Sequence, residues 1–139
     1  MAKVLLDSSY LVSLALSSET YHRKTILFGA KTKHNLLIPD VVLVEAMYNI
    51  RRLGQGTYSG LKFGQLLSSQ QPQFVGLTNP DFDRAITLMR QYKDAELDFV
   101  DCCITVMAER LNITQICTYD RRDFSMIPPN HVEYFELLP

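Results

Sequence analysis

Short apolar runs alternate with longer amphipathic segments along the chain. The short runs end at an acid, a proline or a polar cluster, as buried strands do where they reach a loop. The longer segments space their apolar residues at helical intervals, which is typical of helices with one buried face. The short runs predict strands at residues 3–7, 35–39, 73–77, 114–120 and 131–137.

The predicted helices lie between these strands, and several carry recognisable end signals. Asp40 is a candidate N-cap for a helix that stops at Gly54, and Asn79 with Pro80 opens another. Residues 54–60, rich in glycine, form the most flexible-looking segment. The helical segments are 8–16, 19–35, 40–53, 61–69, 79–92 and 96–111.

Strands that alternate with helices favour a parallel sheet covered by helices on both faces. The chain has 139 residues and shows no repeat, linker or low-complexity tract, so we predict a single α/β domain over residues 1–139. The composition, with 47% hydrophobic and 21% charged residues, is that of an ordinary globular protein.

The net charge and the cysteines indicate where the protein works and what it binds. The net charge is -1, so any binding of nucleic acid would need a local basic patch. Cys102, Cys103 and Cys117 form no C-x-x-C pair, which is typical of reduced thiols in a cytosolic protein. Asp7 interrupts the N-terminal apolar run, and no segment is long enough to span a bilayer. We therefore expect a cytoplasmic protein without membrane association.

Four acids do not look like ordinary surface acids. Asp7 and Asp120 end predicted strands, and Glu45 lies in the middle of a helix among apolar neighbours. Asp101 is in the first turn of the most apolar helix, at residues 96–111. A buried, unpaired carboxylate costs several kcal/mol, which is comparable to the net stability of a whole fold. Something must therefore offset these charges.

A divalent cation at the edge of the sheet would offset them. Ligands of parallel sheets bind beyond the carboxyl ends of the strands, where the strand order reverses. If the strands of Asp7 and Asp120 flank that point, both carboxylates enter one crevice, and Glu45 and Asp101 could enter it from the helices. Oxygen ligands suit Mg²⁺ or Mn²⁺, which activates a bound water and neutralises a phosphodiester. An acidic set without histidine or cysteine thus predicts phosphoryl chemistry and not a zinc site.

The two helical acids also have plainer explanations. Asp101 could complete a weak capping box with Asp98, for which an N-cap role would be enough. Glu45 could pair with Arg51 or Arg52, one to two turns further along its helix. We favour the site for both, because capping does not require so apolar a neighbourhood and such helix pairs contribute only about 0.5 kcal/mol.

The two acids at the strand ends, Asp7 and Asp120, also have alternative roles outside a metal site. Asp7 could be a turn acid that accepts hydrogen bonds from the amides of the following helix. Asp120 could be another turn acid, paired with Arg121 or Arg122. For Asp120 the functional interpretation depends mainly on a family resemblance.

Taken in order, four segments of the chain resemble the PIN domain, and most closely the VapC-type toxins of bacterial toxin–antitoxin pairs. The segments are "VLLDSSYLVSL", "IPDVVLVEAMYNIRR", "LDFVDCCITVMAERLNI" and "ICTYDRRDF", and the match covers essentially the whole chain. The resemblance implies a three-layer α/β/α fold with a five-stranded parallel sheet. It also implies Mg²⁺- or Mn²⁺-dependent endoribonuclease activity, frequent homodimers and a small antitoxin that occludes the site. The implied catalytic and metal-binding cluster is Asp7, Glu45, Asp101 and Asp120, with Glu45 able to act through water.

Further residues have secondary expected roles. Asp98 and Asp123 are additional candidates at the metal, and Asp123 could reach it through water. Ser9 and Thr118 could orient the carboxylates by hydrogen bonds. The basic residues that neighbour the crevice, and could contact RNA phosphates, are Arg51, Arg52, Arg121 and Arg122.

Two other functions are considered. A PIN-like fold could serve as an RNA- or protein-binding module with little or no catalysis. A phospho-acceptor receiver domain also has acids at its strand ends, but it needs paired acids near the first strand and a lysine after the last. Here the first strand ends in one acid and no lysine follows Lys93, which argues against that class.

Overall fold

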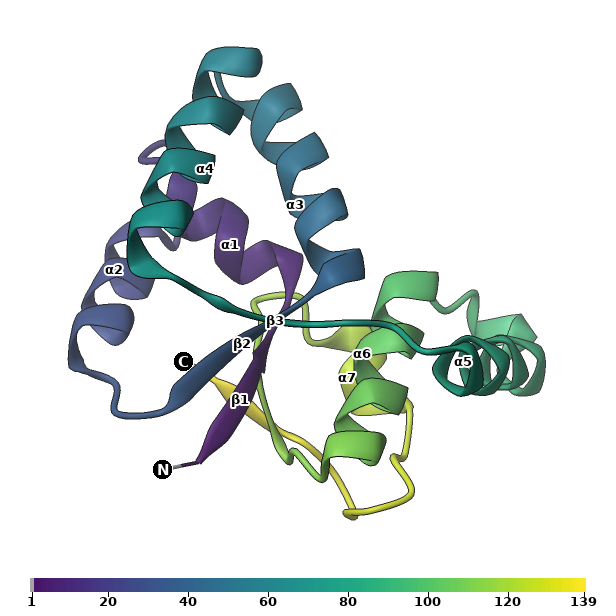
Figure 1. The fold of residues 1–139 in the computed structure, drawn as a ribbon. Helices are drawn as coiled ribbons and strands as arrows, with labels where there is room; N and C mark the ends of the chain where they lie inside the picture. The colour runs from purple at the N-terminus through teal and green to yellow at the C-terminus, as the bar shows by residue number, and fades with distance from the viewer. Residues whose placement is uncertain (1) are drawn as a thin grey trace.

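The computed structural model describes residues 2–139, and its strands form one five-stranded sheet (Figure 1). The strand order is β3-β2-β1-β4-β5, and every neighbouring pair is parallel. The predicted parallel sheet is confirmed, although most strands are shorter than expected. The strands are β1 (Lys3–Leu6), β2 (Asn35–Pro39), β3 (Gln73–Val75), β4 (Gln115–Cys117) and β5 (Glu136–Leu138).

The strand order reverses between β1 and β4. From β1 the chain proceeds to β2 and β3 on one side, then returns to build β4 and β5 on the other. Leu6 is paired with Cys117, and the N–H of Asp7 donates to the Cys117 carbonyl at 2.9 Å. Asp7 therefore lies at the switch point, just beyond the last paired residue of β1, where parallel sheets bind their ligands.

The helices cover both faces of the sheet, which gives three layers (Figure 1). One layer holds α1 (Ser8–Ala15), α2 (His22–Lys31), α3 (Asp40–Leu53) and α4 (Thr57–Gln70). The other holds α5 (Asn79–Gln91), α6 (Phe99–Leu111) and α7 (Arg122–Met126), with the 3₁₀ turn η1 (Lys93–Ala95) between α5 and α6.

Helix α6 lies in the interior, as its apolar sequence predicts. All residues from Asp101 to Ala108 are buried, because α6 packs on the sheet with one face and on α5 with another. Val4 and Leu5 of β1 are fully buried in the larger core cluster, next to Ile104 of α6. The packing of α6 on the sheet and on α5 carries the Asp101 carboxylate into the protein.

Two helix starts differ from the predictions. Pro39 occupies the N-cap position of α3, and Asp40 is the first helical residue. The Asp40 carboxylate instead accepts N–H groups from Val41 at 2.8 Å and from Leu77 at 3.2 Å, and so ties α3 to the loop after β3. Helix α2 begins at His22 and not at residue 19, because the preceding residues form turns.

Two segments have more helix and less strand than expected. Residues 54–60 contain the first turn of α4, which starts at Thr57, directly after Gly56 with its left-handed φ of 64°. The loop expected after β4 contains the short helix α7, and β5 begins at Glu136 and not at residue 131. No helix within residues 2–139 is both long and apolar enough to cross a membrane.

Candidate active site

Asp7 is almost completely buried and is held by neutral hydrogen-bond donors. Its side chain is 3% exposed and caps α1, since Oδ1 accepts the N–H of Ser8 at 2.7 Å. Oδ2 accepts the hydroxyl of Thr118 at 2.7 Å and that of Ser9 at 3.1 Å. The predicted contacts of Ser9 and Thr118 with a carboxylate are therefore present. The alternative of a turn acid is thus confirmed for Asp7, while its role at a metal stays a prediction.

Glu45 and Asp101 approach from opposite helix layers. Glu45 on α3 accepts a hydrogen bond from the Ser8 hydroxyl, and among residues 2–139 no ion pair involves Glu45. The alternative pairing of Glu45 with an arginine is thus wrong. Asp101 on α6 is 6% exposed. Asp98 occupies the predicted N-cap position of α6, but its side chain makes no capping hydrogen bond, so the alternative of a capping box with Asp101 is wrong as well.

The two remaining acids, Asp120 and Asp123, lie in the loop after β4 and in α7. Asp120 is exposed, and its backbone N–H donates to Thr118 Oγ1 at 3.0 Å. Asp123 is buried, where Oδ2 accepts the N–H of Asp98 at 3.1 Å and Oδ1 pairs with Arg122 at 2.7 Å. The expected alternative, a pairing of Asp120 with Arg121 or Arg122, is not found among the described residues.

All of the predicted acids line one cavity of about 590 Å³, which we call the acidic cleft. The predicted carboxylates that line it are those of Asp7, Glu45, Asp98, Asp101, Asp120 and Asp123, and Ser9 lines it as well. Thr118 is fully buried beneath it, bound to Asp7. The cleft therefore gathers acids from both helix layers and from the ends of β1 and β4.

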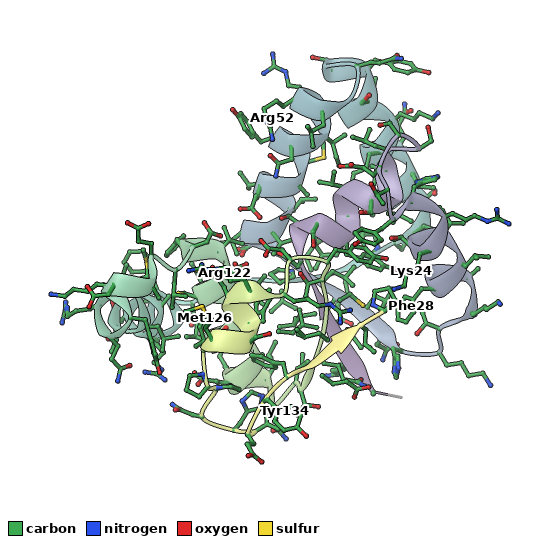
Figure 2. All side chains as sticks on the ribbon, turned by 180° about the vertical axis from the view of Figure 1, so that it is seen from behind. Lys24, Phe28, Arg52, Arg122, Met126 and Tyr134 are labelled. Carbon is green, nitrogen blue, oxygen red and sulfur yellow. The ribbon has the colours of Figure 1, made fainter. Side chains whose placement is uncertain are left out.

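Two of the four predicted basic residues line the acidic cleft, and two do not. Arg52 on α3 and Arg122 on α7 line the acidic cleft, and Figure 2 labels both. Arg51 instead lines a separate groove between α3 and α4. Arg121 donates to the carbonyl of Pro139 at 3.0 Å and is not part of the cleft lining.

Burial and the charges of neighbouring acids raise the pKa values of three cleft acids, Asp101, Asp7 and Glu45. Burial raises the pKa of Asp101 to about 9, aided by the charge of Asp7 and by a hydrogen bond with Asp123 that requires a proton. Burial also raises the pKa of Asp7, although the hydrogen bonds from Thr118, Ser8 and Ser9 oppose this. The pKa of Glu45 is raised by burial and by the charges of neighbouring acids, among them Asp98. The cleft thus holds more negative charge than the chain itself neutralises.

The carboxylates of the cleft are suitable ligands for a hard divalent cation, but they are not yet arranged around a single metal position. Residues 2–139 contain no group of three or more His, Cys, Asp or Glu side chains already placed to hold a metal ion. The carboxylates of Asp7, Glu45 and Asp123 are each turned toward their own hydrogen-bond donors. The available ligands are all carboxylate oxygens, which Mg²⁺ and Mn²⁺ prefer. A bound cation would also remove the repulsion that raises these pKa values.

Several cleft residues were not predicted from the sequence. Asn49 lies one turn after Glu45 on the same face of α3, a spacing that could have revealed it. Glu19 resembles a surface acid in the sequence, yet it lines the cleft. Tyr21 and Tyr119 also line it, and their juxtaposition leaves no local sequence signal.

The fold and the cleft define an α/β protein with carboxylates clustered at the switch point of a parallel sheet. The family model of the PIN domain matches residues 4–128, so this chain belongs to the PIN domain family. This confirms the family resemblance of the four acidic segments. No curated protein sequence matches the chain.

Solved structures with the same fold include several described as toxins. VapC20 of Mycobacterium tuberculosis, described as a sarcin–ricin loop cleaving toxin, has a TM-score of 0.81 and 17% identity, over 94% of this chain and 98% of that one. A toxin–antitoxin complex from Klebsiella pneumoniae has a TM-score of 0.67 and 19% identity, over 96% of this chain and 99% of that one. DNA-bound VapBC from Salmonella typhimurium has a TM-score of 0.69 and 15% identity, over 99% of this chain and 97% of that one. At such identities the likeness shows a common fold.

Proposed function

We propose that the protein is a metal-dependent endoribonuclease that hydrolyses RNA phosphodiester bonds, and that it acts as the toxin of a type II toxin–antitoxin pair. The observation that carries the proposal is the convergence of Asp7, Glu45, Asp101 and Asp120 in one cleft, with raised pKa values at the first three. Membership of the PIN domain family and the fold shared with a sarcin–ricin loop cleaving toxin support it.

In this proposal Asp7, Asp101 and Asp120 hold Mg²⁺ or Mn²⁺, and Glu45 acts directly or through water. Asp98 and Asp123 are secondary ligands, Asp123 through water, and their place in the lining of the cleft supports this. When bound, the metal supplies positive charge to the phosphate and increases the acidity of a water molecule.

The remaining chemistry belongs to the chain. Ser9 and Thr118 keep Asp7 oriented, and Ser8 fixes Glu45. Glu45, which lines the cleft, is the candidate base that accepts the proton of the attacking water. The water oxygen then bonds to phosphorus, one P–O ester bond breaks, and the proton that Glu45 accepted passes to the leaving oxygen.

The basic side chains of the cleft would bind the RNA backbone. Arg52 and Arg122 line the cleft and are exposed, so both can reach phosphates on either side of the bond to be cut. Arg51 and Arg121 are outside the cleft lining, and we assign them no contact with the cleaved phosphate.

The test is cleavage of end-labelled RNAs: a sarcin–ricin loop hairpin, a transfer RNA and an unstructured oligonucleotide. We expect cleavage with Mg²⁺ or Mn²⁺, none with EDTA, and a loss of at least 100-fold in Asp7→Asn and Asp101→Asn. Asp83→Asn, at an exposed position of α5, is the matched control and should cleave normally. Activity that survives chelation or both substitutions would refute the mechanism.

A second candidate is a PIN-fold binding module with little catalysis. It is favoured by one observation, the lack of a ready-made metal site among the described residues. Titration calorimetry with Mn²⁺ separates the two candidates. The nuclease should bind the ion in a manner that Asp101→Asn abolishes, whereas a binding module need not bind it.

The toxin assignment includes a cytoplasmic location, a small antitoxin partner and a homodimer. Induced expression should arrest growth, and co-expression of a short open reading frame directly upstream should relieve the arrest. The Asp101→Asn variant should not arrest growth. Light scattering of the purified protein tests the dimer. A chain that is harmless and lacks such a neighbour is not a toxin.

A further inference from the structure

Two tyrosines stack on each other at the rim of the acidic cleft. The ring centroids of Tyr21 and Tyr119 are 4.3 Å apart, and the ring planes differ by 5°. Tyr21 directly precedes α2, whereas Tyr119 lies between β4 and Asp120. Tyr119 covers one face of the Tyr21 ring, yet Tyr21 is still 45% exposed and lines the cleft. The exposed part of Tyr21 therefore borders the cleft.

One buried hydroxyl group fixes both partners of the stack. The Thr25 hydroxyl, in a residue that is fully buried, donates to the backbone carbonyl of Tyr21 at 2.8 Å. Its single proton is then used, so the Tyr119 hydroxyl, 2.6 Å away, donates to Thr25. A ring held in this way loses little conformational freedom when a ligand stacks on it.

The stack is also tied to the acids. The backbone N–H of Tyr119 donates to Ser9 Oγ at 2.9 Å, and that hydroxyl donates to Asp7 at 3.1 Å. Asp120 follows Tyr119 directly in the chain. These hydrogen bonds and the peptide bond to Asp120 thus fix the position of the Tyr119 ring relative to the carboxylates.

One basic side chain lies beside the stack, and two more line the cleft that the stack borders. Lys24 Nζ lies 6.0 Å from the centroid of the Tyr119 ring, and Arg52 and Arg122 line the cleft. Figure 2 labels these three side chains, which come from α2, α3 and α7. An exposed aromatic ring near basic side chains is the arrangement that binds single-stranded nucleic acid, with bases on the rings and phosphates on the cations.

We propose that Tyr21, backed by Tyr119, is a stacking platform for one unpaired nucleobase of single-stranded RNA, next to the phosphodiester in the acidic cleft. Tyr21 is a positioning residue, and the inference rests on the proposed nuclease function. Exposure alone does not single it out, because Tyr134 is 72% exposed. What distinguishes Tyr21 is the rigid backing ring and its place in the cleft.

The test measures base stacking apart from cleavage. RNAs that carry 2-aminopurine at successive unpaired positions are titrated with Asp101→Asn protein in Mg²⁺, so that no cleavage interferes. The emission should fall at one position, because stacking quenches it. Adding Tyr21→Leu should abolish this quenching and weaken binding roughly ten-fold, whereas Tyr21→Phe should preserve both. Tyr134→Leu is the matched control and should leave both unchanged.

Kinetics on the cleaving enzyme complete the test. Tyr21→Leu should raise KM roughly ten-fold with kcat changed less than three-fold, and Tyr21→Phe should restore KM. Circular dichroism confirms that each variant is folded. If wild-type protein cleaves but Tyr21→Leu behaves like Tyr134→Leu, the platform is refuted and the nuclease stands. If nothing is cleaved but the Tyr21-dependent quenching persists, the nuclease is refuted and the platform stands. If no RNA binds, both are refuted.

Discussion

Asp101 should make the metal-free protein less stable as the pH rises. The pKa of this buried carboxyl is raised from 3.8 to about 9, chiefly by burial. Between these two values the folded protein keeps a proton that the unfolded chain releases. Folding then takes up a proton, so the free energy of unfolding falls as the pH increases. The stabilisation is complete below the unfolded pKa and is lost as the pH rises toward the folded one.

The magnitude follows from the number of protons. One proton taken up on folding changes the free energy of unfolding by about 1.4 kcal/mol per pH unit, or about 4 kcal/mol between pH 5 and pH 8. This is a large part of the 5–15 kcal/mol that stabilises a typical domain. The slope does not depend on the exact pKa, provided that it lies above the pH range of the measurement.

The perturbation is Asp101→Asn, which keeps the shape of the side chain but cannot take up a proton. The variant should lose about 1.4 kcal/mol per pH unit of the wild-type slope, and it should be more stable than wild type at pH 8. Some slope should remain, because the pKa values of Asp7 and Glu45 are raised as well.

The assay is urea unfolding followed by circular dichroism at pH 5, 6, 7 and 8, in EDTA. Asp83→Asn, at an exposed position, is the control and should run parallel to wild type. If Asp101→Asn also runs parallel to wild type, then Asp101 takes up no proton on folding, and the electrostatic account of the cleft is wrong.

Three further predictions concern the metal and the fold. The cation and protons compete for the same carboxylates, so saturating Mn²⁺ should raise the wild-type Tm more at pH 8 than at pH 6. The Tm of Asp101→Asn should rise little at either pH. Equal shifts in both proteins would show that the ion binds outside the cleft. In urea unfolding, Gly54→Ala should destabilise the protein by roughly 1–3 kcal/mol, since an added Cβ would lie 2.8 Å from a backbone oxygen. Gly64→Ala, in open space within α4, should instead stabilise the protein by about 0.5–1 kcal/mol. Asp81→Ala should cost roughly 2–4 kcal/mol in the same assay, because it removes a capping box and leaves Arg110 without its partner; a loss below 0.5 kcal/mol would contradict this.

The sequence predicted the features that depend on local pattern and on one topological rule. The apolar runs located the strands, and the acids at their ends marked the edge of the sheet. The rule that ligands bind where strand order reverses then placed Asp7 and Asp120 together, as the order of β1 and β4 shows. Their catalytic and metal-binding roles stay predictions.

The features that sequence analysis missed depend on tertiary partners. Asp98 was expected to cap α6 with its side chain, but what the structure shows is its backbone N–H bound to Asp123, 25 residues later. The stack of Tyr21 on Tyr119 joins two loops that are distant in the sequence. Neither contact produces a periodicity, so no window of neighbouring residues could have indicated it.

Two buried aspartates of the same chain support the proposed cation site by their contrast. Asp81 on α5 and Asp101 on α6 are buried to a similar degree, at 4% and 6% exposure. Although burial alone would raise the pKa of Asp81, hydrogen bonds from Arg110 and Thr78 lower it below its ordinary value. The pKa of Asp101 instead rises to about 9, chiefly through burial, and the neighbouring carboxylates raise it further. The same fold thus neutralises one buried aspartate with an arginine and surrounds the other with acids. An acid kept only for structure would be expected to resemble Asp81, so the contrast points to a positive charge that the chain does not supply.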